Sequence, residues 1–542
     1  MSARAQGVAV IGLDAATFTV IDPLVAEGQL PHIARVLAEG SSGVLRSTTH
    51  PLTPVAWTTM VTGVNAGRHG IWDFSARDAS GHHVRLVNGS HRTAAAVWDY
   101  ASTAGRRVGL FNVPFSWPAP AVDGFAVSGL DASARADRAV FPDSLADELR
   151  RTFGPLADDH SFPLTPTGAV DIDRVRKVCS QRCDVLEWLV ERFDPELLFV
   201  VFMSADHVHH LAWPDWERRG AESVVADVYR ILDEAVGRIR AIPALAEHAT
   251  MIVSDHGGGA LDGVVDLNAW LASEGLLTWR SGIGHAHPTG LGRQAMSAAY
   301  RAQRALPAAM RDRLKRAAPG MRERALELRE VSAIDWSRTK AFAYGAFGNL
   351  VVNVRGRESH GIVGEAEYES VRDDLISRAL QLTGPDGRKI VAAVHRREDL
   401  FSGPELARLP DLIVEFADYA WLGKAPLHEP SSEIWTEIRV GPGGCAPYVG
   451  SHRHEGVVAL SGPSCRQGVT LAAAIEDVCP TILQLLEAPA PHDLDGRPLL
   501  EALEREPVAA GSFAPLATAH VSYTDEAGDE VSARLRDLGY LE

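Results

Sequence analysis

The sequence of 542 residues predicts an α/β fold with a mostly parallel central sheet and helices on both of its faces. Short apolar runs alternate with longer amphipathic stretches, which is the pattern of buried strands covered by helices. Aspartate or histidine follows several of these runs, and ligands of open α/β sheets bind at the carboxyl ends of the strands. Hydrophobic residues make up 46% and charged residues 23% of the chain, which excludes a disordered chain, a collagen and a coiled-coil rod.

The first half of the chain is predicted to supply most of this sheet. Val8–Leu13 is an unbroken apolar run of strand length, and residues 30–39 have the apolar spacing of a helix that ends at Gly40. Residues 173–193 and 223–242 are predicted as long helices between strands. Further strands are expected at 107–112, Leu197–Phe202, 251–254 and 457–460.

The composition divides the chain into four segments. Residues 1–270 are predicted as the first part of the α/β core, and 271–340 as a mainly helical insertion, or cap. Within it, 291–340 holds 12 Lys+Arg against 5 Asp+Glu. The core is predicted to continue through 341–505, and the acidic residues 506–542 are expected to form a tail on the surface. Residues 341–440 are expected to form a mixed α/β lobe, with strands in 342–354, 389–394 and 412–415 and a helix at 365–382.

The charge and cysteine content limit the partners and the compartment. The 53 Lys+Arg and 70 Asp+Glu give a net charge of −17, which argues against a nucleic-acid coat function. No run approaches the roughly 18 apolar residues of a membrane span, and the first apolar run stops at Asp14, too early for a signal peptide. Five cysteines without a C-x-x-C pair indicate a reducing compartment, so we expect a cytoplasmic protein.

Two short motifs have the composition of metal sites. Asp206 and His210 are four residues apart, so they share one face of a helix and suit Zn²⁺. Asp255 and His256 end a strand before three glycines, which let the backbone bend close to a ligand. The alternatives are an Asp that caps a helix, followed by partly exposed histidines, and a strand-terminal turn.

Three further positions add candidate ligands or a nucleophile. His452 or His454 precedes a strand and is a candidate to complete a metal shell, and Asp14 closes the first strand, where a buried carboxylate needs a partner. Thr53 lies at a turn before a helix, and a hydroxyl there acts as a nucleophile if a metal and the helix N-terminus assist it. For Thr58 and Thr59 we favour simple helix capping.

Together, these motifs resemble the alkaline phosphatase superfamily, and most closely its type I phosphodiesterase/nucleotide pyrophosphatase branch. The resemblance covers residues 7–260 and 340–500. It rests on the order of the motifs, which is more specific than any one of them: Asp14, Thr53 before W-T-x-x-x-T-G, His69-Gly70-Ile71, D-x-x-x-H, S-D-H-G, G-S-H-R-x-x-G, Ser461-Gly462-Pro463 and the run from Cys479-Pro480-Thr481 to Leu499. It implies an alkaline-phosphatase-like α/β fold.

The resemblance also implies two divalent metal ions, Zn²⁺ or alternatively Mn²⁺. Asp14, Thr53, Asp255 and His256 would hold one ion; Asp206, His210 and His452 would hold the other, with His454 as the fallback for His452. Thr53 would be the nucleophile and would form a phospho-threonine that water then hydrolyses.

The substrate side of the site is less defined by the resemblance. Ala56 stands three residues after Thr53, where the resemblance leads us to expect an Asn that donates to a phosphoryl oxygen, so Trp57, the backbone or another side chain would supply that donor. Arg46, Arg68 and Arg92 are the local candidates for a phosphate clamp, each more readily explained as a surface cation. The sulfatase motif C-x-P-x-R is absent, and Thr53 argues against the mutase branch, which uses Ser.

The sequence therefore favours a phosphodiesterase or pyrophosphatase that acts on a small molecule such as a nucleotide. The alternatives are a phosphomonoesterase or phosphonate hydrolase with the same site, and a non-catalytic protein that binds a phosphorylated ligand. The basic insertion would suit a polyanionic substrate, although a solvated helical face with Arg–Glu pairs explains it equally well. The sequence does not set the oligomeric state.

Overall fold

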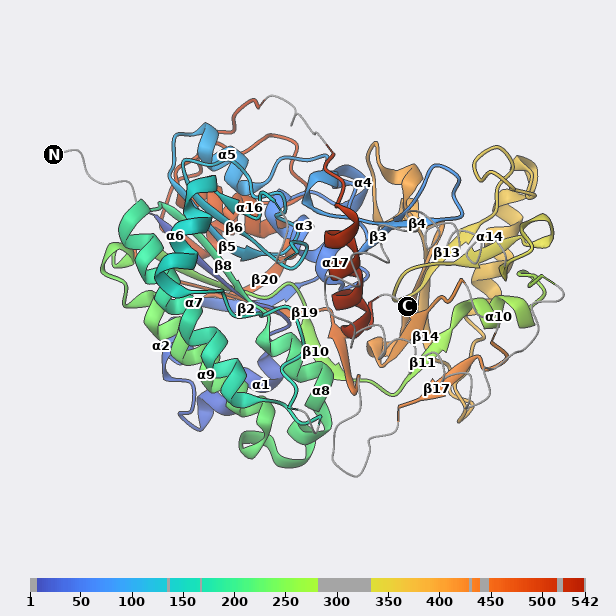
Figure 1. Cartoon of the computed structure of the whole chain (residues 1–542), viewed down its shortest axis with the longest axis horizontal. Coiled ribbons are helices and arrows are strands. Elements are labelled where there is room, and N and C mark those ends of the chain that lie inside the picture. Colours follow the sequence, from blue (N-terminus) through green and yellow to red (C-terminus); the bar gives the residue numbers. More distant parts are fainter. Residues whose placement is uncertain are drawn as a thin grey trace, which may run out of the picture.

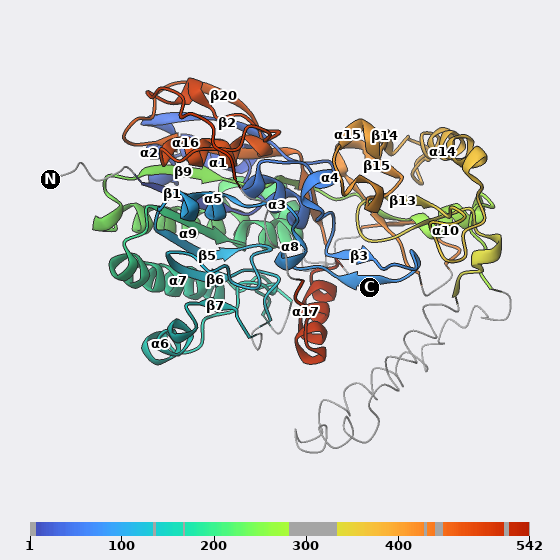
Figure 2. The same cartoon turned by 90° about the horizontal axis from the view of Figure 1, so that it is seen from above.

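We describe the protein from a computed structural model. Its largest sheet has nine strands (Figures 1 and 2). The structure describes residues 7–133, 137–165, 168–280, 333–427, 431–438, 448–513 and 520–540, so most of the predicted insertion, 281–332, lies outside the described residues. In spatial order the strands are β20 (Thr470–Ala474), β2 (Gly40–Arg46), β19 (Glu455–Ser461), β9 (Ala249–Val253), β1 (Val8–Leu13), β8 (Leu197–Phe202), β5 (Val108–Val113), β6 (Gly124–Ser128) and β7 (Val140–Phe141).

Most neighbouring strands of this sheet run parallel, as predicted. β9, β1, β8, β5 and β6 form one continuous parallel set, and β2 pairs in parallel with β20. β19 lies between β9 and β2 and is antiparallel to both, and β7 is antiparallel to β6. The five strands predicted for this sheet are present within about two residues of their expected bounds.

Helices cover both faces because alternate side chains of each strand point to opposite sides. In β1, Val8 and Val10 join one core, whereas Ala9, Ile11 and Leu13 join the other. The first core is covered by α3 (Thr53–Thr62), α5 (Val97–Thr103) and α16 (Val478–Leu485); the second by α1 (Phe18–Ala26), α2 (Pro31–Ala38), α6 (Asp143–Phe153), α7 (Ile172–Phe193), α8 (Ser204–Arg219) and α9 (Val224–Arg240). None of the helices in the described ranges is long and apolar enough to cross a membrane.

A smaller lobe lies beside the main sheet (Figure 1). Its antiparallel sheet has the order β12 (Ala341–Ala343), β13 (Asn349–Val352), β15 (Leu412–Phe416) and β14 (Val391–Arg396), with α14 (Glu365–Ala379) packed on it. The strand region expected at 342–354 is a hairpin of β12 and β13. Gly345 and Gly348 adopt positive φ angles between them, which a residue with a side chain rarely does, and the chain reverses there.

The remaining elements of the described chain are short connections around the two sheets. They are α4 (Ala66–His69), α10 (Leu267–Ser273), α15 (Arg397–Leu400), β3 (Ser75–Arg77), β4 (Val84–Leu86), β10 (Gly257–Ala260), β11 (Gly263–Asp266), β16 (Trp421–Lys424), β17 (Trp435–Glu437) and β18 (Gly450–Arg453). Of these, β10 and β18 pair with each other and matter most for the site described below.

The C-terminal segment differs from the surface tail that the sequence predicts. It contains the helix α17 (Asp525–Asp537), which lies between the main body and the lobe (Figures 1 and 2). Val531, Leu535 and Leu538 are 2–3% exposed and belong to the first core. These residues lie on one face of the helix, and the acidic composition of the segment conceals that apolar stripe.

Candidate metal centre

Acidic and histidine side chains gather at the carboxyl edge of the main sheet. Asp14 directly follows β1, Asp206 lies in the first turn of α8 after β8, and Asp255 and His256 follow β9. The antiparallel pair of β10 and β18 brings His452 to the same edge, with His452 opposite Gly258. All of these side chains are buried, as is Thr53 at the start of α3.

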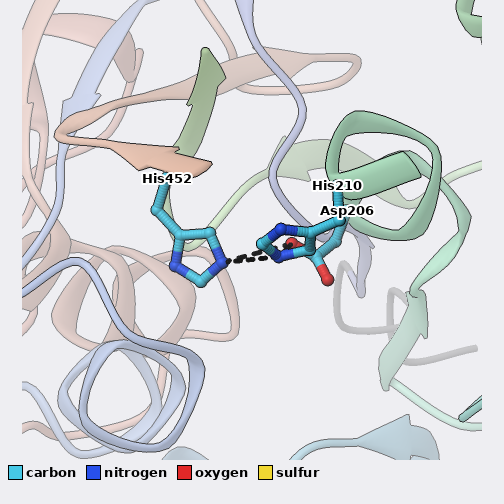
Figure 3. A group of neighbouring side chains, drawn as sticks. All are labelled: Asp206, His210 and His452. Atoms are coloured by element: carbon cyan, nitrogen blue, oxygen red, sulfur yellow. Dashed lines mark hydrogen bonds and ion pairs between the residues drawn. The ribbon is translucent and has the colours of Figure 1, made fainter. Parts of the chain in front are cut away.

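Asp206, His210 and His452 form the first group (Figure 3). The Asp206 Oδ1 atom lies 3.2 Å from His210 Nε2 and 3.4 Å from His452 Nε2, and the two Nε2 atoms are 3.1 Å apart. His210 Nδ1 donates to the carbonyl of Gly450 at 2.9 Å, and His452 Nδ1 donates to that of Pro51 at 2.6 Å. A carbonyl can only accept, so Nδ1 of each ring carries a proton and Nε2 is the atom that faces the carboxylate, as in histidines that bind metals.

Asp14, Asp206 and His256 form the second group, so Asp206 belongs to both. His256 Nε2 lies 3.8 Å from Asp14 Oδ1 and 3.4 Å from Asp255 Oδ2. These three atoms are fully buried and have no hydrogen-bond partner. The rings of His256 and His452 stack with centroids 3.7 Å apart, which joins the two groups into one centre.

Burial controls the protonation of these groups. Burial, together with repulsion from Asp255 and Asp206, raises the pKa of Asp14 well above its ordinary value, and burial also raises the pKa of Asp255. Burial opposes the charge of Asp206 as well, but attraction to His210 and His452 holds its pKa well below the ordinary value. Burial lowers the pKa of His256, which keeps its ring neutral.

The donor set fits divalent cations. Three carboxylates are buried together, and no Lys or Arg in the described ranges forms an ion pair with any of them. Unpaired buried charge is costly, and buried polar atoms without partners are rare in native proteins. Cations bound by the two groups would satisfy both the carboxylates and the bare Nε2 atoms, so the residues are consistent with a bimetallic site.

Thr53 is the first residue of α3, where the helix N-terminus favours negative charge. Its hydroxyl forms a side-chain hydrogen bond with Tyr540, whose own hydroxyl lies 3.2 Å from His452 Nε2. Pro51, two residues before Thr53, accepts the hydrogen bond from His452. The predicted nucleophile therefore adjoins the first group of predicted ligands.

The other predicted site residues lie in different surroundings. The Trp57 indole donates to Asp14 Oδ2 at 2.8 Å, and its ring packs beneath the site against Phe199. Ala56 is fully buried in the first core, and Arg46 ends β2 on the surface. His454 points to the lobe, 3.6 Å from Glu415, rather than to Asp206. Arg68 pairs with Asp493 and Asp495, and Arg92 with Asp99.

Sequence reasoning missed Tyr540 altogether. Nothing in the local pattern of an acidic C-terminal segment marks one aromatic residue, and its partners His452 and His210 lie 88 and 330 positions earlier in the chain. Only the docking of α17 brings it to the centre.

Comparison with solved structures agrees with the fold. The nine-stranded sheet has the fold of alkaline-phosphatase-like proteins: the phosphonoacetate hydrolase of Sinorhizobium meliloti 1021 with bound phosphonoformate matches with a TM-score of 0.54 at 14% identity, over 90% of this chain and 96% of that one. The same hydrolase with phosphonoacetate gives 0.53 at 13% identity, again over 90% and 96%. An inactive murine ectonucleotide pyrophosphatase/phosphodiesterase 5 with AMP gives 0.49 at 16% identity, over 90% and 97%.

Comparison at the level of sequence assigns the family. The profile described as type I phosphodiesterase / nucleotide pyrophosphatase matches residues 8–437, which is most of the chain. The protein is therefore an enzyme of the type I phosphodiesterase/nucleotide pyrophosphatase family, within the alkaline phosphatase superfamily. Among curated proteins, none matches this sequence.

Proposed function

We propose that the protein hydrolyses a phosphodiester or pyrophosphate bond of a small molecule such as a nucleotide, with Thr53 as the nucleophile. The observation that carries this proposal is a buried threonine at the N-terminus of α3, beside the group of Asp206, His210 and His452, which shares Asp206 with the second Asp/His group. Membership of the family supports the choice of a diester or pyrophosphate substrate.

In this proposal, Asp14, Thr53, Asp255 and His256 hold one cation and Asp206, His210 and His452 hold the other. Zn²⁺ is the expected metal and Mn²⁺ the alternative, because both accept carboxylate and imidazole ligands. When bound, the two cations would supply positive charge for the transferring phosphoryl group and would make nearby hydroxyl groups more acidic. The hydrogen bonds from Nδ1 to the carbonyls of Gly450 and Pro51 keep the imidazoles of His210 and His452 oriented.

Thr53 then performs the covalent step. Its Oγ1 attacks phosphorus and gives its proton to solvent, and a phospho-threonine forms while the bond from phosphorus to the leaving oxygen breaks and that oxygen takes up a proton from solvent. Water subsequently attacks the same phosphorus, which releases the phosphoryl product and restores the Thr53 hydroxyl. The N-terminus of α3 stabilises the negative charge that develops beside it.

A second candidate is a phosphonate hydrolase or phosphomonoesterase with the same site. The specific observation in its favour is the fold match to phosphonoacetate hydrolase over 90% of this chain. Membership of an enzyme family argues against the third alternative, a non-catalytic protein that binds a phosphorylated ligand, and such a protein would have no need of a threonine hydroxyl beside the metal ligands.

Turnover of bis(p-nitrophenyl) phosphate and of p-nitrophenyl phosphate tests these functions. Protein stripped with a chelator is assayed with Zn²⁺ or Mn²⁺ added back, beside the Thr53→Ala variant. We expect metal-dependent preference for the diester and loss of nearly all turnover in T53A with metal content retained. Preference for the monoester would establish the second candidate instead, and full activity of T53A would show that Thr53 is not the nucleophile.

A further inference from the structure

The C-terminal segment delivers one aromatic side chain into the candidate centre. Tyr540 follows α17 by three residues and is 9% exposed. Its hydroxyl lies 3.2 Å from His452 Nε2 and 3.4 Å from His210 Nε2, and it shares a hydrogen bond with Thr53. A single phenol therefore touches the predicted nucleophile and two predicted ligands of one cation.

The ring of Tyr540 is held firmly in this place. It stacks on Phe74, with ring centroids 4.5 Å apart and an interplanar angle of 28°. On the other side, Gly539 packs against Tyr448: an added Cβ at Gly539 would lie 2.2 Å from the Tyr448 hydroxyl. The φ angle of Gly539 is +70°, so a residue with a side chain there would be strained as well as blocked.

The segment that carries Tyr540 is built into the main body. Arg534 donates to the carbonyls of Leu130 at 2.7 Å and Ala132 at 2.9 Å. The Tyr523 ring stacks on Trp117 with centroids 4.7 Å apart, and its hydroxyl donates to the carbonyl of Asp131 at 2.7 Å. These contacts and the buried apolar face of α17 indicate that the segment is a permanent part of the fold and not a detachable inhibitory segment.

A cavity opens beside Tyr540 on the side of the lobe. Tyr540, Gly539 and His210 line one wall, and Gly345–Phe347 and Lys424 line the other. The Lys424 ammonium lies 5.7 Å from the centre of the Tyr448 ring. Tyr540 thus contacts the candidate centre through its hydroxyl and also lines a cavity that carries a cationic side chain, which would suit an anionic substrate.

We propose that Tyr540 is a catalytic residue whose hydroxyl donates a hydrogen bond to the phosphoryl group that Thr53 attacks. This inference rests on the function proposed above. It also supplies a side-chain donor where the α3 segment has none to spare, because Ala56 has no polar atom in its side chain and the Trp57 indole is already bonded to Asp14. The phenol has one proton to donate, and a phosphoryl oxygen would receive it in place of its present partners.

The test compares Tyr540→Phe with the wild-type protein, both loaded with the same metal. We expect kcat for bis(p-nitrophenyl) phosphate to fall about 10- to 100-fold, as for the loss of one hydrogen bond to a charged group. We also expect inorganic phosphate to bind about tenfold more weakly by isothermal titration calorimetry. Metal content and the far-ultraviolet circular dichroism spectrum should stay unchanged.

Tyr523→Phe is the matched control, because it removes a hydroxyl that anchors the same segment outside the centre. Its phosphate affinity and kcat should stay within about twofold of the wild type. Equal values for Y540F and wild type in both measurements would overturn the proposal. So would higher turnover after deletion of residues 520–542, which would identify the segment as an inhibitory plug.

The two proposals fail in different ways. If the wild-type protein turns over neither ester, the proposed function fails, yet the phosphate affinities of wild type and Y540F still show whether the phenol contacts a phosphoryl group. If the wild type is active and Y540F matches it in both readouts, only the role of Tyr540 is wrong.

Discussion

At the scale of single residues, the candidate centre is a concentration of buried charge that the protein alone does not neutralise. Asp14 and Asp255 each keep a buried oxygen without a hydrogen-bond partner, and His256 keeps a bare Nε2. Trp57 donates to the other oxygen of Asp14 at 2.8 Å, which lowers the pKa of that carboxyl against the larger effect of burial. Such a set is stable only when positive charge joins it.

The two candidate histidines of the motif before β19 should be separable by metal content. His452 lies 3.4 Å from Asp206, whereas His454 lies beside Glu415 in the lobe. We expect His452→Ala to lower the metal bound per chain from about two ions to about one, and His454→Ala to leave it unchanged. Elemental analysis of the purified variants measures this. The opposite ranking would assign the ligand role to His454.

Trp57 should act on the metal rather than on the substrate. We expect Trp57→Phe to weaken metal binding about tenfold or more, because it removes a hydrogen bond that holds a ligand carboxylate in its charged form. Competition with a chelating dye measures the affinity. If Trp57 contacted the substrate instead, KM would rise while metal affinity stayed constant.

At the scale of elements, the lobe depends on one buried carboxylate. Asp411, just before β15, is 0% exposed and accepts two hydrogen bonds of 2.6 Å from Arg357. Tyr368 of α14 donates to it at 2.6 Å, and the backbone N–H of Val352 in β13 donates at 2.8 Å. A single side chain thus ties the loop of Arg357, α14 and β13 together.

Asp411→Asn should therefore destabilise the lobe by about 3 kcal/mol near neutral pH, since it removes the buried carboxylate that pairs with both Arg357 and Arg397. Burial opposes the charge, but Arg357 holds the pKa of Asp411 below its ordinary value. The stabilisation is then complete above the unfolded pKa of about 4 and is lost as pH falls through the lowered pKa.

The measurement is urea unfolding of both proteins across this pH range. The difference between wild type and D411N should shrink below pH of about 4. Asp386→Asn, which removes an exposed partner of Arg388, is the control and should cost less than about 1 kcal/mol. A difference that is independent of pH would contradict the ionic role of Asp411.

At the scale of the whole molecule, the centre joins parts of the chain that are far apart in sequence. The segments that follow β1, β8 and β9 supply its carboxylates, and β18 supplies His452. The C-terminal segment, whose helix α17 lies between the main body and the lobe (Figure 1), adds Tyr540. Occupation of the centre should therefore stabilise the fold as a whole.

Metal should raise the melting temperature in a concentration-dependent way. At 100-fold excess over Kd, each site adds about 2.7 kcal/mol to the free energy of unfolding. We expect Asp14→Asn to melt higher than wild type in excess chelator, because an uncompensated buried charge is gone, and to gain less from added Zn²⁺. Differential scanning calorimetry measures both effects. Identical melting with and without metal would show that the centre does not bind these ions.

Much of this architecture is contained in local sequence patterns. The apolar run of β1 and the helical spacing of α7 and α9 depend on side-chain periodicity alone, so the fold class and these elements are predictable. The i, i+4 spacing of Asp206 and His210 predicts a shared helix face, and the structure places them 3.2 Å apart. The roles of the seven predicted ligands, among them the nucleophile Thr53, remain predictions that the geometry supports.

Only the tertiary structure decided which distant groups meet. The hairpin of β12 and β13, the direction of His454 and the burial of α17 follow from packing between segments whose local patterns do not encode their partners. Tyr540 reaches the centre because apolar residues of α17 dock on the main body, and the contact joins positions 88 and 330 residues apart. The periodicity of apolar side chains relates residues a few positions apart, whereas contacts between distant segments depend on how the surfaces of the folded elements fit together.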